Sequence, residues 1–398
     1  MQRSYYPLIM LEVKMTDSNY INNNSLEDTI EIIEEEQNDS YSNDDLYNIN
    51  SWGADLSFRE LITMYDEGEL QKPELQRNYV WDKVEASRFI DSLLLGLPVP
   101  SIFLANTSDE NKLIIDGFQR IMTVYDYVTG IWSKDSRVFK LSDSRKINAK
   151  WRGKAFNELT VSEKKKIRST TIHAIIFEQT VPSNDDTSLY QIFERINTGG
   201  RSLMAQEIRN CVYQGKLNTL LIELNNNIKW RTLFGSNKPD ARMRDMEFIL
   251  RGLALNTQKI KSHEPANISL KKLLNEYMGD KANNTSDMID TIKTDFENTI
   301  NFIHDNIGPD AFFNIIQSDP SRIRRRFYPT IFDALYVATS IALNSGEDIN
   351  TNDLEHKRNE LLQNQTFRSH ITSGTMQIEN IHGRISMALE FLYGIQYR

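Results

Sequence analysis

The chain has 398 residues, of which 39% are hydrophobic and 25% charged, and its formal net charge is −9. This length allows two or three compact units with a substantial core, and the composition is typical of a soluble globular protein. No apolar run approaches the roughly 18–20 residues that a membrane-spanning helix needs. Because Cys211 is the only cysteine, an internal disulfide and a thiolate-based zinc site are excluded. We therefore expect a cytoplasmic protein with no membrane partner.

The negative charge is concentrated near the N-terminus. Lys and Arg are absent between Lys14 and Arg59, whereas eleven carboxylates occur there: Asp17, Glu27, Asp28, Glu31, Glu34, Glu35, Glu36, Asp39, Asp44, Asp45 and Asp55. Removing these eleven charges from −9 leaves +2 for the rest of the chain. The stretch is rich in Asn and Ser and poor in large apolar residues, so we expect residues 1–50 to be a largely disordered acidic tail. Such a tail either solvates the protein or covers a basic groove until nucleic acid displaces it. Its first part, Met1–Lys14, lacks the pattern of a signal peptide, and Met15 is an alternative start.

Ordered structure is predicted from about Trp52, with helix and strand signals alternating. Three helix starts are marked by side chains able to cap a first turn, namely Ser57, Asp82 with Glu85, and Thr160 with Glu163. Extended segments are predicted at residues 73–80, 101–105, 112–116 and 171–177. Beyond the last of these, strand signals largely disappear and a series of helical segments follows. This order predicts an α+β unit at residues 51–205 and a helical unit at residues 206–398.

The first candidate site is the sequence Leu75-Gln76-Arg77-Asn78-Tyr79-Val80-Trp81. Gln76 and Arg77 can donate hydrogen bonds to an anion, and Tyr79 and Trp81 offer flat faces to a base or a guanidinium. The alternative is a strand with both aromatic rings in the core and Arg77 paired locally.

The second candidate site is the turn from Asp116 to Arg120, where an apolar run ends in Asp-Gly and a helix begins. Gly117 permits a sharp turn, and the start of the helix offers free N–H groups and a positive dipole end to a phosphate. Arg120 can grip a phosphate oxygen, Asp116 can hold a metal ion or a water, and Thr123 lies on an adjacent part of the helix face. The alternative is that Asp116 only caps the helix and Arg120 only pairs with it.

The third candidate site is the sequence Phe193-Glu194-Arg195-Ile196-Asn197-Thr198-Gly199-Gly200, followed by Gln206-Glu207-Ile208-Arg209-Asn210. Two predicted helices meet at the Asn-Thr-Gly-Gly corner, whose backbone N–H groups can form a nest for an anion. The alternative is a corner between helices whose charges pair with each other.

Two further clusters have weaker functional interpretations. The densest basic run, Arg322–Arg326, can contact a nucleic-acid backbone, although a solvated helix end is the simpler interpretation. His370, Asn380 and His382 share only their letters with a His-Asn-His nuclease, because neither their spacing nor a β-hairpin supports that site.

Taken in order, these segments resemble the N-terminal domain of GmrSD-type restriction endonucleases, in the ParB/sulfiredoxin-like group. The resemblance rests on Gln76-Arg77-x-Tyr79-Val80-Trp81, Arg88-Phe89-Ile90-Asp91-Ser92-Leu93-Leu94-x-Gly96-x-Pro98-x-Pro100, Ile115-Asp116-Gly117-x-Gln119-Arg120 and Phe193-x-Arg195-Ile196-Asn197-Thr198-Gly199-Gly200. It implies a ParB-like mixed sheet with helices, followed by an all-helical domain. It also implies a role in prokaryotic defence against foreign, often modified, DNA.

The resemblance further implies that the Asp-Gly-Gln-Gln-Arg motif binds and hydrolyses a nucleotide. Here Phe118 replaces the first Gln of that motif, which weakens the transfer of hydrolysis more than that of nucleotide binding. Relatives often carry a C-terminal His-Asn-His nuclease domain, which this sequence does not show, so a separately encoded nuclease is a possible partner.

The leading hypothesis is therefore a nucleotide-binding, DNA-acting defence module, either an NTPase or a nuclease-assisting protein. GTP, ATP and CTP are equally compatible with the sequence, Mg²⁺ is a possible cofactor, and DNA is the expected partner. Asp116 and Arg120 are assigned catalytic roles, Tyr79 and Trp81 wall the site, and the phosphate-binding set is Gln76, Arg77, Gly117, Gln119, Thr123, Arg195, Asn197 and Thr198. The rival hypothesis is a non-catalytic sensor or regulator that binds DNA or a protein.

Overall fold

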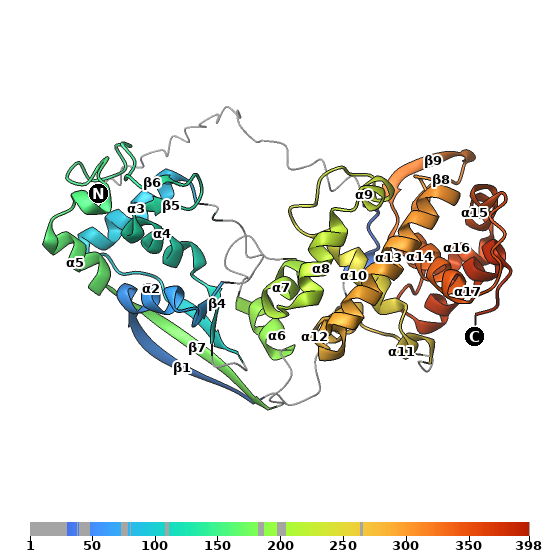
Figure 1. Cartoon of the computed structure of the whole chain (residues 1–398), viewed down its shortest axis with the longest axis horizontal. Coiled ribbons are helices and arrows are strands. Elements are labelled where there is room, and N and C mark those ends of the chain that lie inside the picture. Colours follow the sequence, from blue (N-terminus) through green and yellow to red (C-terminus); the bar gives the residue numbers. More distant parts are fainter. Residues whose placement is uncertain are drawn as a thin grey trace, which may run out of the picture.

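The computed structural model describes residues 30–37, 39, 48–72, 79, 81–107, 111–181, 187–196, 204–262 and 266–397. A five-stranded sheet with its helices forms the N-terminal part, and a mostly helical part follows it (Figure 1). This arrangement confirms the predicted α+β class, with a mixed sheet followed by a helical region.

The sheet has the strand order β1-β7-β3-β4-β2. The bounds are β1 Asn48–Ser57, β2 Leu70–Gln71, β3 Ile102–Asn106, β4 Lys112–Asp116 and β7 Thr171–Val181. Neighbouring pairs alternate between antiparallel and parallel, so the sheet is mixed. Strand β1 was not predicted because its sequence is polar. It is held instead by pairing along its whole length with β7, from Asn48 opposite Val181 to Ser57 opposite Thr171.

Four of the helices of the N-terminal part are α2 Phe58–Asp66, α3 Lys83–Leu95, α4 Phe118–Thr129 and α5 Val161–Ser169, with a small hairpin of β5 Ile131–Trp132 and β6 Arg137–Val138 after α4. Three of these, α2, α3 and α5, begin where the capping side chains predicted. Ser57, Asp82 and Thr160 each accept a hydrogen bond from the first turn of their helix, and the Glu three residues later bonds back to the cap. These reciprocal bonds satisfy N–H groups that a helix start otherwise leaves open.

The two faces of the sheet belong to different hydrophobic cores. Ile114 of β4 packs with residues of α2, α3, α4 and α5, whereas Leu113 and Ile115 on the other face join Tyr190 and Phe193 of α6 (Thr187–Ile196). In Figure 1, α3, α4 and α5 accordingly lie on one side of the sheet, and α6 lies between the sheet and the C-terminal helices. Side chains alternate across a strand, so one short apolar strand serves both cores.

The C-terminal part consists mainly of helices. They are α7 Ala205–Val212, α8 Lys216–Asn225, α9 Ile228–Phe234, α10 Arg244–Leu255, α11 Gln258–Lys261, α12 Leu270–Gly279, α13 Ser286–Asn306, α14 Pro329–Asn344, α15 Leu354–Gln363, α16 Gln365–Thr372 and α17 Ile378–Tyr393. The region is not all-helical, because β8 Phe313–Ile316 and β9 Asp319–Phe327 form an antiparallel hairpin. The basic run Arg322–Arg326 lies on β9, so its interpretation as a helix end was wrong. Ile323 is the only apolar residue within this run, so the run lacks the alternation of apolar and polar residues that predicts a strand.

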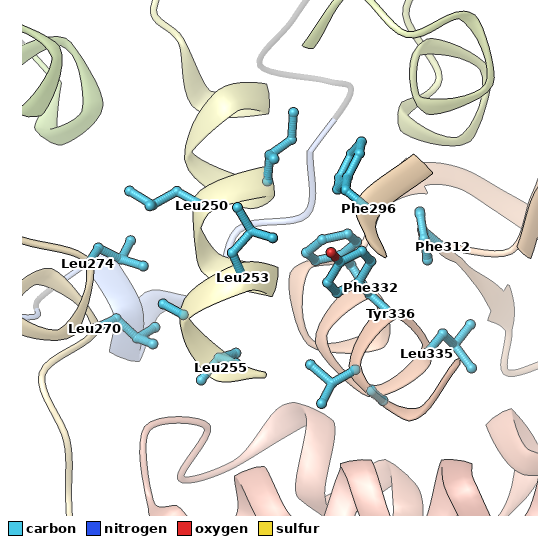
Figure 2. Packing of buried hydrophobic residues seen from close by; sticks show 14 of the residues in the cluster. Leu250, Leu253, Leu255, Leu270, Leu274, Phe296, Phe312, Phe332, Leu335 and Tyr336 are labelled. Atoms are coloured by element: carbon cyan, nitrogen blue, oxygen red, sulfur yellow. The ribbon is translucent and has the colours of Figure 1, made fainter. Parts of the chain in front are cut away.

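The core of the helical part is rich in aromatic rings around Trp230, which is fully buried. Its ring lies 5.6 Å from that of Phe332 and 6.1 Å from that of Phe296, within the range of favourable edge-to-face contacts. Figure 2 shows Leu253 of α10 directed toward Phe332 and Tyr336 of α14, while Leu250 lies toward Leu274 of α12. Helix α10 is therefore packed on two sides.

Residues 30–37 are ordered, which corrects the expectation that they belong to a disordered tail. Ile30 forms a parallel bridge with Phe327 of β9, and residues Glu34–Gln37 form the short helix α1 beside the helical part. Their acidic composition predicted disorder because the sequence alone did not reveal the distant cations that bind them. The rest of the predicted tail, up to residue 47, lies outside the described residues except for Asp39.

A buried network of four charges anchors α1. Arg251 of α10 donates to Glu36 at 2.6 and 2.9 Å and to Asp333 of α14 at 2.7 and 2.6 Å. Arg384 of α17 also donates to Asp333, at 2.8 Å. Burial alone would raise the pKa of Glu36, but the charge and hydrogen bonds of Arg251 outweigh burial and lower it. Two guanidiniums and two carboxylates thus balance in the interior.

We predict that Asp333→Ala destabilises the fold by about 3–5 kcal/mol, because it leaves two buried guanidiniums with one carboxylate. The measurement is the free energy of unfolding in urea. Asp348→Ala removes the same charge from an exposed position, and it should change stability by less than about 0.5 kcal/mol. Equal losses in the two variants would contradict the assigned role of the network.

Candidate functional site

The turn between β4 and α4 requires glycine on two counts. Gly117 is the residue that precedes the helix, and its φ of 103° lies in the left-handed region. A Cβ atom at this position would lie 2.2 Å from Cγ2 of Ile102, at the start of β3. Both constraints bring the first turn of α4 close against the neighbouring strand.

Arg120 fastens this turn to the segment that precedes β3. One terminal nitrogen donates to the carbonyl oxygens of Pro100 and Ser101, at 2.6 and 2.8 Å, and the other donates to Asp116 Oδ2 at 2.6 Å. The Arg120 side chain is only 13% exposed, whereas that of Asp116 is 44% exposed. Arg120 is therefore engaged by the protein, and Asp116 is the more accessible member of the pair.

The alternative interpretation of this turn is correct in one respect and wrong in another. Arg120 does pair with Asp116, but Asp116 does not cap the helix. The capping position belongs to Gly117, which has no side chain to bond the first turn. The amide groups at the start of α4 therefore have no side-chain cap from that residue, an arrangement typical of anion sites at helix starts.

The first and second candidate sites meet through a chain of hydrogen bonds. Tyr79 Oη lies 2.6 Å from Thr123 Oγ1, and Thr123 Oγ1 donates to the carbonyl oxygen of Gln119 at 2.6 Å. Gln119 Oε1 in turn accepts from the backbone N–H of Trp81, at 3.3 Å. The segment that ends in Tyr79-x-Trp81 is thus bound directly to the first turns of α4.

Thr123 and Tyr79 are buried, so they position other groups and do not face a ligand. Thr123 is fully buried and Tyr79 is 8% exposed. Burial raises the pKa of Tyr79 to about 12, so its hydroxyl stays protonated near neutral pH. The Tyr79 ring packs edge-to-face against Trp132 at 6.2 Å, and the half-buried Trp81 packs against Phe89 at 5.6 Å. This geometry agrees with the core interpretation of the two rings.

Four residues of the predicted phosphate set, Gln76, Arg77, Asn197 and Thr198, lie outside the described residues. Arg195 lies near the end of α6, on the face of the sheet opposite α4. The structure thus brings together Asp116, Gly117, Gln119 and Arg120, with Tyr79, Trp81 and Thr123 behind them. It does not test the proposed joint site of Arg77, Arg120 and Arg195.

The described charges of the third candidate site are bound to other helices. Glu194 accepts from Lys271 at 2.9 Å, Glu207 pairs with Arg242, and the buried Arg209 donates to Glu247 and to Asn275. The charges are paired, as the alternative interpretation expected, but with partners from α10, α12 and the segment before α10. This part of the motif therefore joins α6 and α7 to the helical core.

The described carboxylates and histidines do not form a metal site of their own. Among the described residues, no group of three or more His, Cys, Asp and Glu side chains is arranged to hold a metal ion. A Mg²⁺ ion at Asp116 would therefore need phosphate oxygens as ligands, as is common for this ion. His370 Nδ1 lies 2.7 Å from Asn380 Oδ1, and His382 contacts the carbonyl oxygen of Ile260. His370 lies on α16 and His382 on α17.

Residues 58–214 match the family model described as GmrSD restriction endonuclease, N-terminal domain. This part of the chain belongs to that family. Membership implies a component of a restriction system, and it extends from α2 to just beyond α7. Residues 215–398 lie outside the match. No match was found among curated proteins, and no helix of the described residues is long and apolar enough to cross a membrane.

Within this GmrSD-type domain, Phe118 has a structural explanation. Its side chain is 9% exposed and packs in the core between the sheet and α4. Phe118 therefore contributes apolar packing, while the neighbouring Asp116, Gln119 and Arg120 keep the polar part of the motif.

Sequence reasoning missed the network of Glu36, Arg251, Asp333 and Arg384. The partners of Arg251 come from α1 and α14, far from it in the sequence. One signal was available, because Asp333 is the only charged residue in the otherwise apolar helix Pro329–Asn344. A carboxylate in such a helix requires a buried partner.

We predict that Gly117→Ala destabilises the domain more than Gly130→Ala does. Both glycines have positive φ, which costs an L-residue roughly 1–2 kcal/mol. Only position 117 adds a clash, with Ile102, which costs about 1–3 kcal/mol more, whereas a Cβ at Gly130 meets nothing within 4 Å. Thermal unfolding measures the difference, and equal shifts in Tm would show that Ile102 does not constrain the turn.

Proposed function

We propose that this chain is the nucleotide-binding, DNA-acting module of a prokaryotic restriction-type defence system in the cytoplasm. The nucleotide would bind at the start of α4, where Arg120 and the first-turn amides would hold its phosphates. Gln76, Arg77, Asn197 and Thr198 would complete the phosphate contacts. A separately encoded nuclease would be a partner for cleavage.

The observation that carries the proposal is the link from Tyr79 and Trp81 to Gln119 and Thr123. It supports a shared site because Gln76 and Arg77 lie only three and two residues before Tyr79. The uncapped start of α4 adds a positive dipole end, which favours a phosphate group. Membership of a restriction family supports DNA as the partner.

Asp116 is suited to positioning Mg²⁺ or a water molecule. Its side chain is 44% exposed and is held in place by Arg120. Mg²⁺ bound with the nucleotide would neutralise charge on the phosphates. Gln119 would orient the site, because Trp81 already fixes its amide oxygen. The base could be guanine, adenine or cytosine.

The rival function, a sensor or regulator that hydrolyses nothing, is favoured by the engagement of Arg120. Its bonds to two carbonyl oxygens and to Asp116 leave fewer N–H groups for a developing phosphate charge. The core position of Phe118 points in the same direction, because it removes one polar group from the motif.

We predict that Arg120→Ala abolishes nucleotide binding measured by calorimetry. The variant should remain folded but lose about 1–3 kcal/mol of stability, because two carbonyl oxygens lose their donor. Arg137→Ala removes the same charge from an exposed position on β6 and should bind as the parent does. Unchanged binding by a folded Arg120→Ala protein would reject the site.

We predict that Asp116→Asn keeps nucleotide binding but releases no phosphate if the chain is an NTPase. The measurement is phosphate release from GTP, ATP and CTP, each with and without DNA and Mg²⁺. Release by the parent that survives in Asp116→Asn would exclude the assigned role of Asp116. Nucleotide binding with no release by the parent under any condition would favour the sensor.

A further inference from the structure

The acidic segment, residues 30–37 and 39, lies on the helical part with its carboxylates bound. Glu36 makes the bidentate pair with Arg251, and Glu31 lies 3.1 Å from Arg324 and 3.6 Å from Arg326 of β9. Two other carboxylates of the segment accept hydrogen bonds from backbone N–H groups. Glu35 accepts from the N–H groups of Gly374 and Thr375, and Asp39 accepts from that of Lys271.

A cavity of about 570 Å³ lies beneath the segment. Residues of the acidic segment form one wall, and helices α7, α10 and α12 form the others. Its charged lining residues are the cations Arg209, Arg244, Arg251 and Lys271 and the carboxylates Glu31, Glu36, Asp39 and Glu247. Three of the cations also pair with carboxylates outside the acidic segment: Arg209 with Glu247, Arg244 with Asp240, and Lys271 with Glu194. Arg322 and Arg325 add further exposed cations on β9, beside the two that bind Glu31.

The buried charges show why this surface requires an anion. Without Glu36, Arg251 and Arg384 would face Asp333 alone, which leaves one uncompensated positive charge. Arg251 is 4% exposed and Arg384 is fully buried, so water cannot solvate that charge well. An acidic oxygen must occupy the position of the Glu36 carboxylate, whether it comes from the chain or from a ligand.

We propose that this surface is a binding site for the phosphate backbone of DNA, and that the acidic segment occupies it in competition with DNA. The anion contacts extend over β9, α10, the start of α12 and the turn before α17, which is more than one nucleotide can reach. The carboxylates of the acidic segment contact these elements one after another, as the successive phosphates of a DNA strand would. The proposal does not depend on the nucleotide site at α4.

The segment is suited to displacement because side-chain carboxylates supply most of its polar contacts. A backbone bond also holds it, since Glu31 N donates to the carbonyl oxygen of Phe327 at 2.8 Å. Ile32 is 59% exposed, although Ile30 is buried against the core. A polyanion that supplies equivalent oxygens would replace the charge contacts without exposing Arg251.

The test measures the affinity of the full chain for a double-stranded DNA oligonucleotide by fluorescence anisotropy. Glu31→Gln with Asp39→Asn weakens the segment without touching the buried Glu36–Arg251 pair, so folding is preserved. It should tighten DNA binding by about three- to tenfold, the value of one or two exposed charge contacts. Asp287→Asn with Asp290→Asn makes the same charge change at exposed positions of α13 and should alter affinity by less than about twofold.

Hydrogen exchange provides the second measurement. Added DNA should accelerate exchange of the amides of residues 30–37, and a nucleoside triphosphate alone should not. Arg324→Gln with Arg326→Gln should weaken DNA binding and reduce its salt dependence. Absence of DNA binding, unchanged exchange when DNA binds, or equal affinity of the segment and control variants would overturn the proposal.

A third variant separates this proposal from the nucleotide site. Arg120→Ala should lose nucleotide binding and keep the DNA affinity of the parent. If Arg120→Ala lost DNA binding while the Glu31–Asp39 variant behaved as its control, DNA would bind at α4 and the surface beneath the acidic segment would not be its site. If the parent chain bound no nucleotide but its acidic segment still competed with DNA, only the function proposed at α4 would be rejected.

Discussion

The close approach of Gly117 to Ile102 is the constraint on which the candidate site depends. It sets α4 against the start of β3, which allows Arg120 to reach both Pro100 and Asp116. The same placement lets Gln119 receive the N–H of Trp81. A single backbone position without a Cβ thus assembles groups from three separate segments, and a larger side chain there would separate them.

The second organising interaction is the charge balance around Arg251, in the helical part. One hydrophobic core runs from Leu113 and Ile115 of the sheet through α6 into α10 and α14. The helical site contacts this core directly, whereas the site at α4 adjoins it only through β4, because α4 packs in the other core. Coupling between them would still require an element with two arrangements. The acidic segment, bound or displaced, is the element that the proposal offers.

The sequence predicted local structure well where the signal lies in neighbouring residues. The capping boxes at Asp82 and Thr160 and the strands around residues 101–116 are such cases. Prediction failed where a distant partner decides the structure. Strand β1 depends on β7, the acidic residues 30–37 depend on Arg251 and β9, and β9 depends on pairing with β8. For the candidate site, the motif residues were predicted and the burial of Tyr79 was one of the two alternatives, but the burial of Thr123 was not predicted.

The most direct test of the site is a crystal structure with a non-hydrolysable nucleoside triphosphate and Mg²⁺. The account predicts phosphate density at the start of α4, with an oxygen within hydrogen-bond distance of Arg120 and with Asp116 directed toward the ion. Ordered ligand at another place, with the contacts of Arg120 to Pro100, Ser101 and Asp116 unchanged and only solvent at the turn, would contradict it.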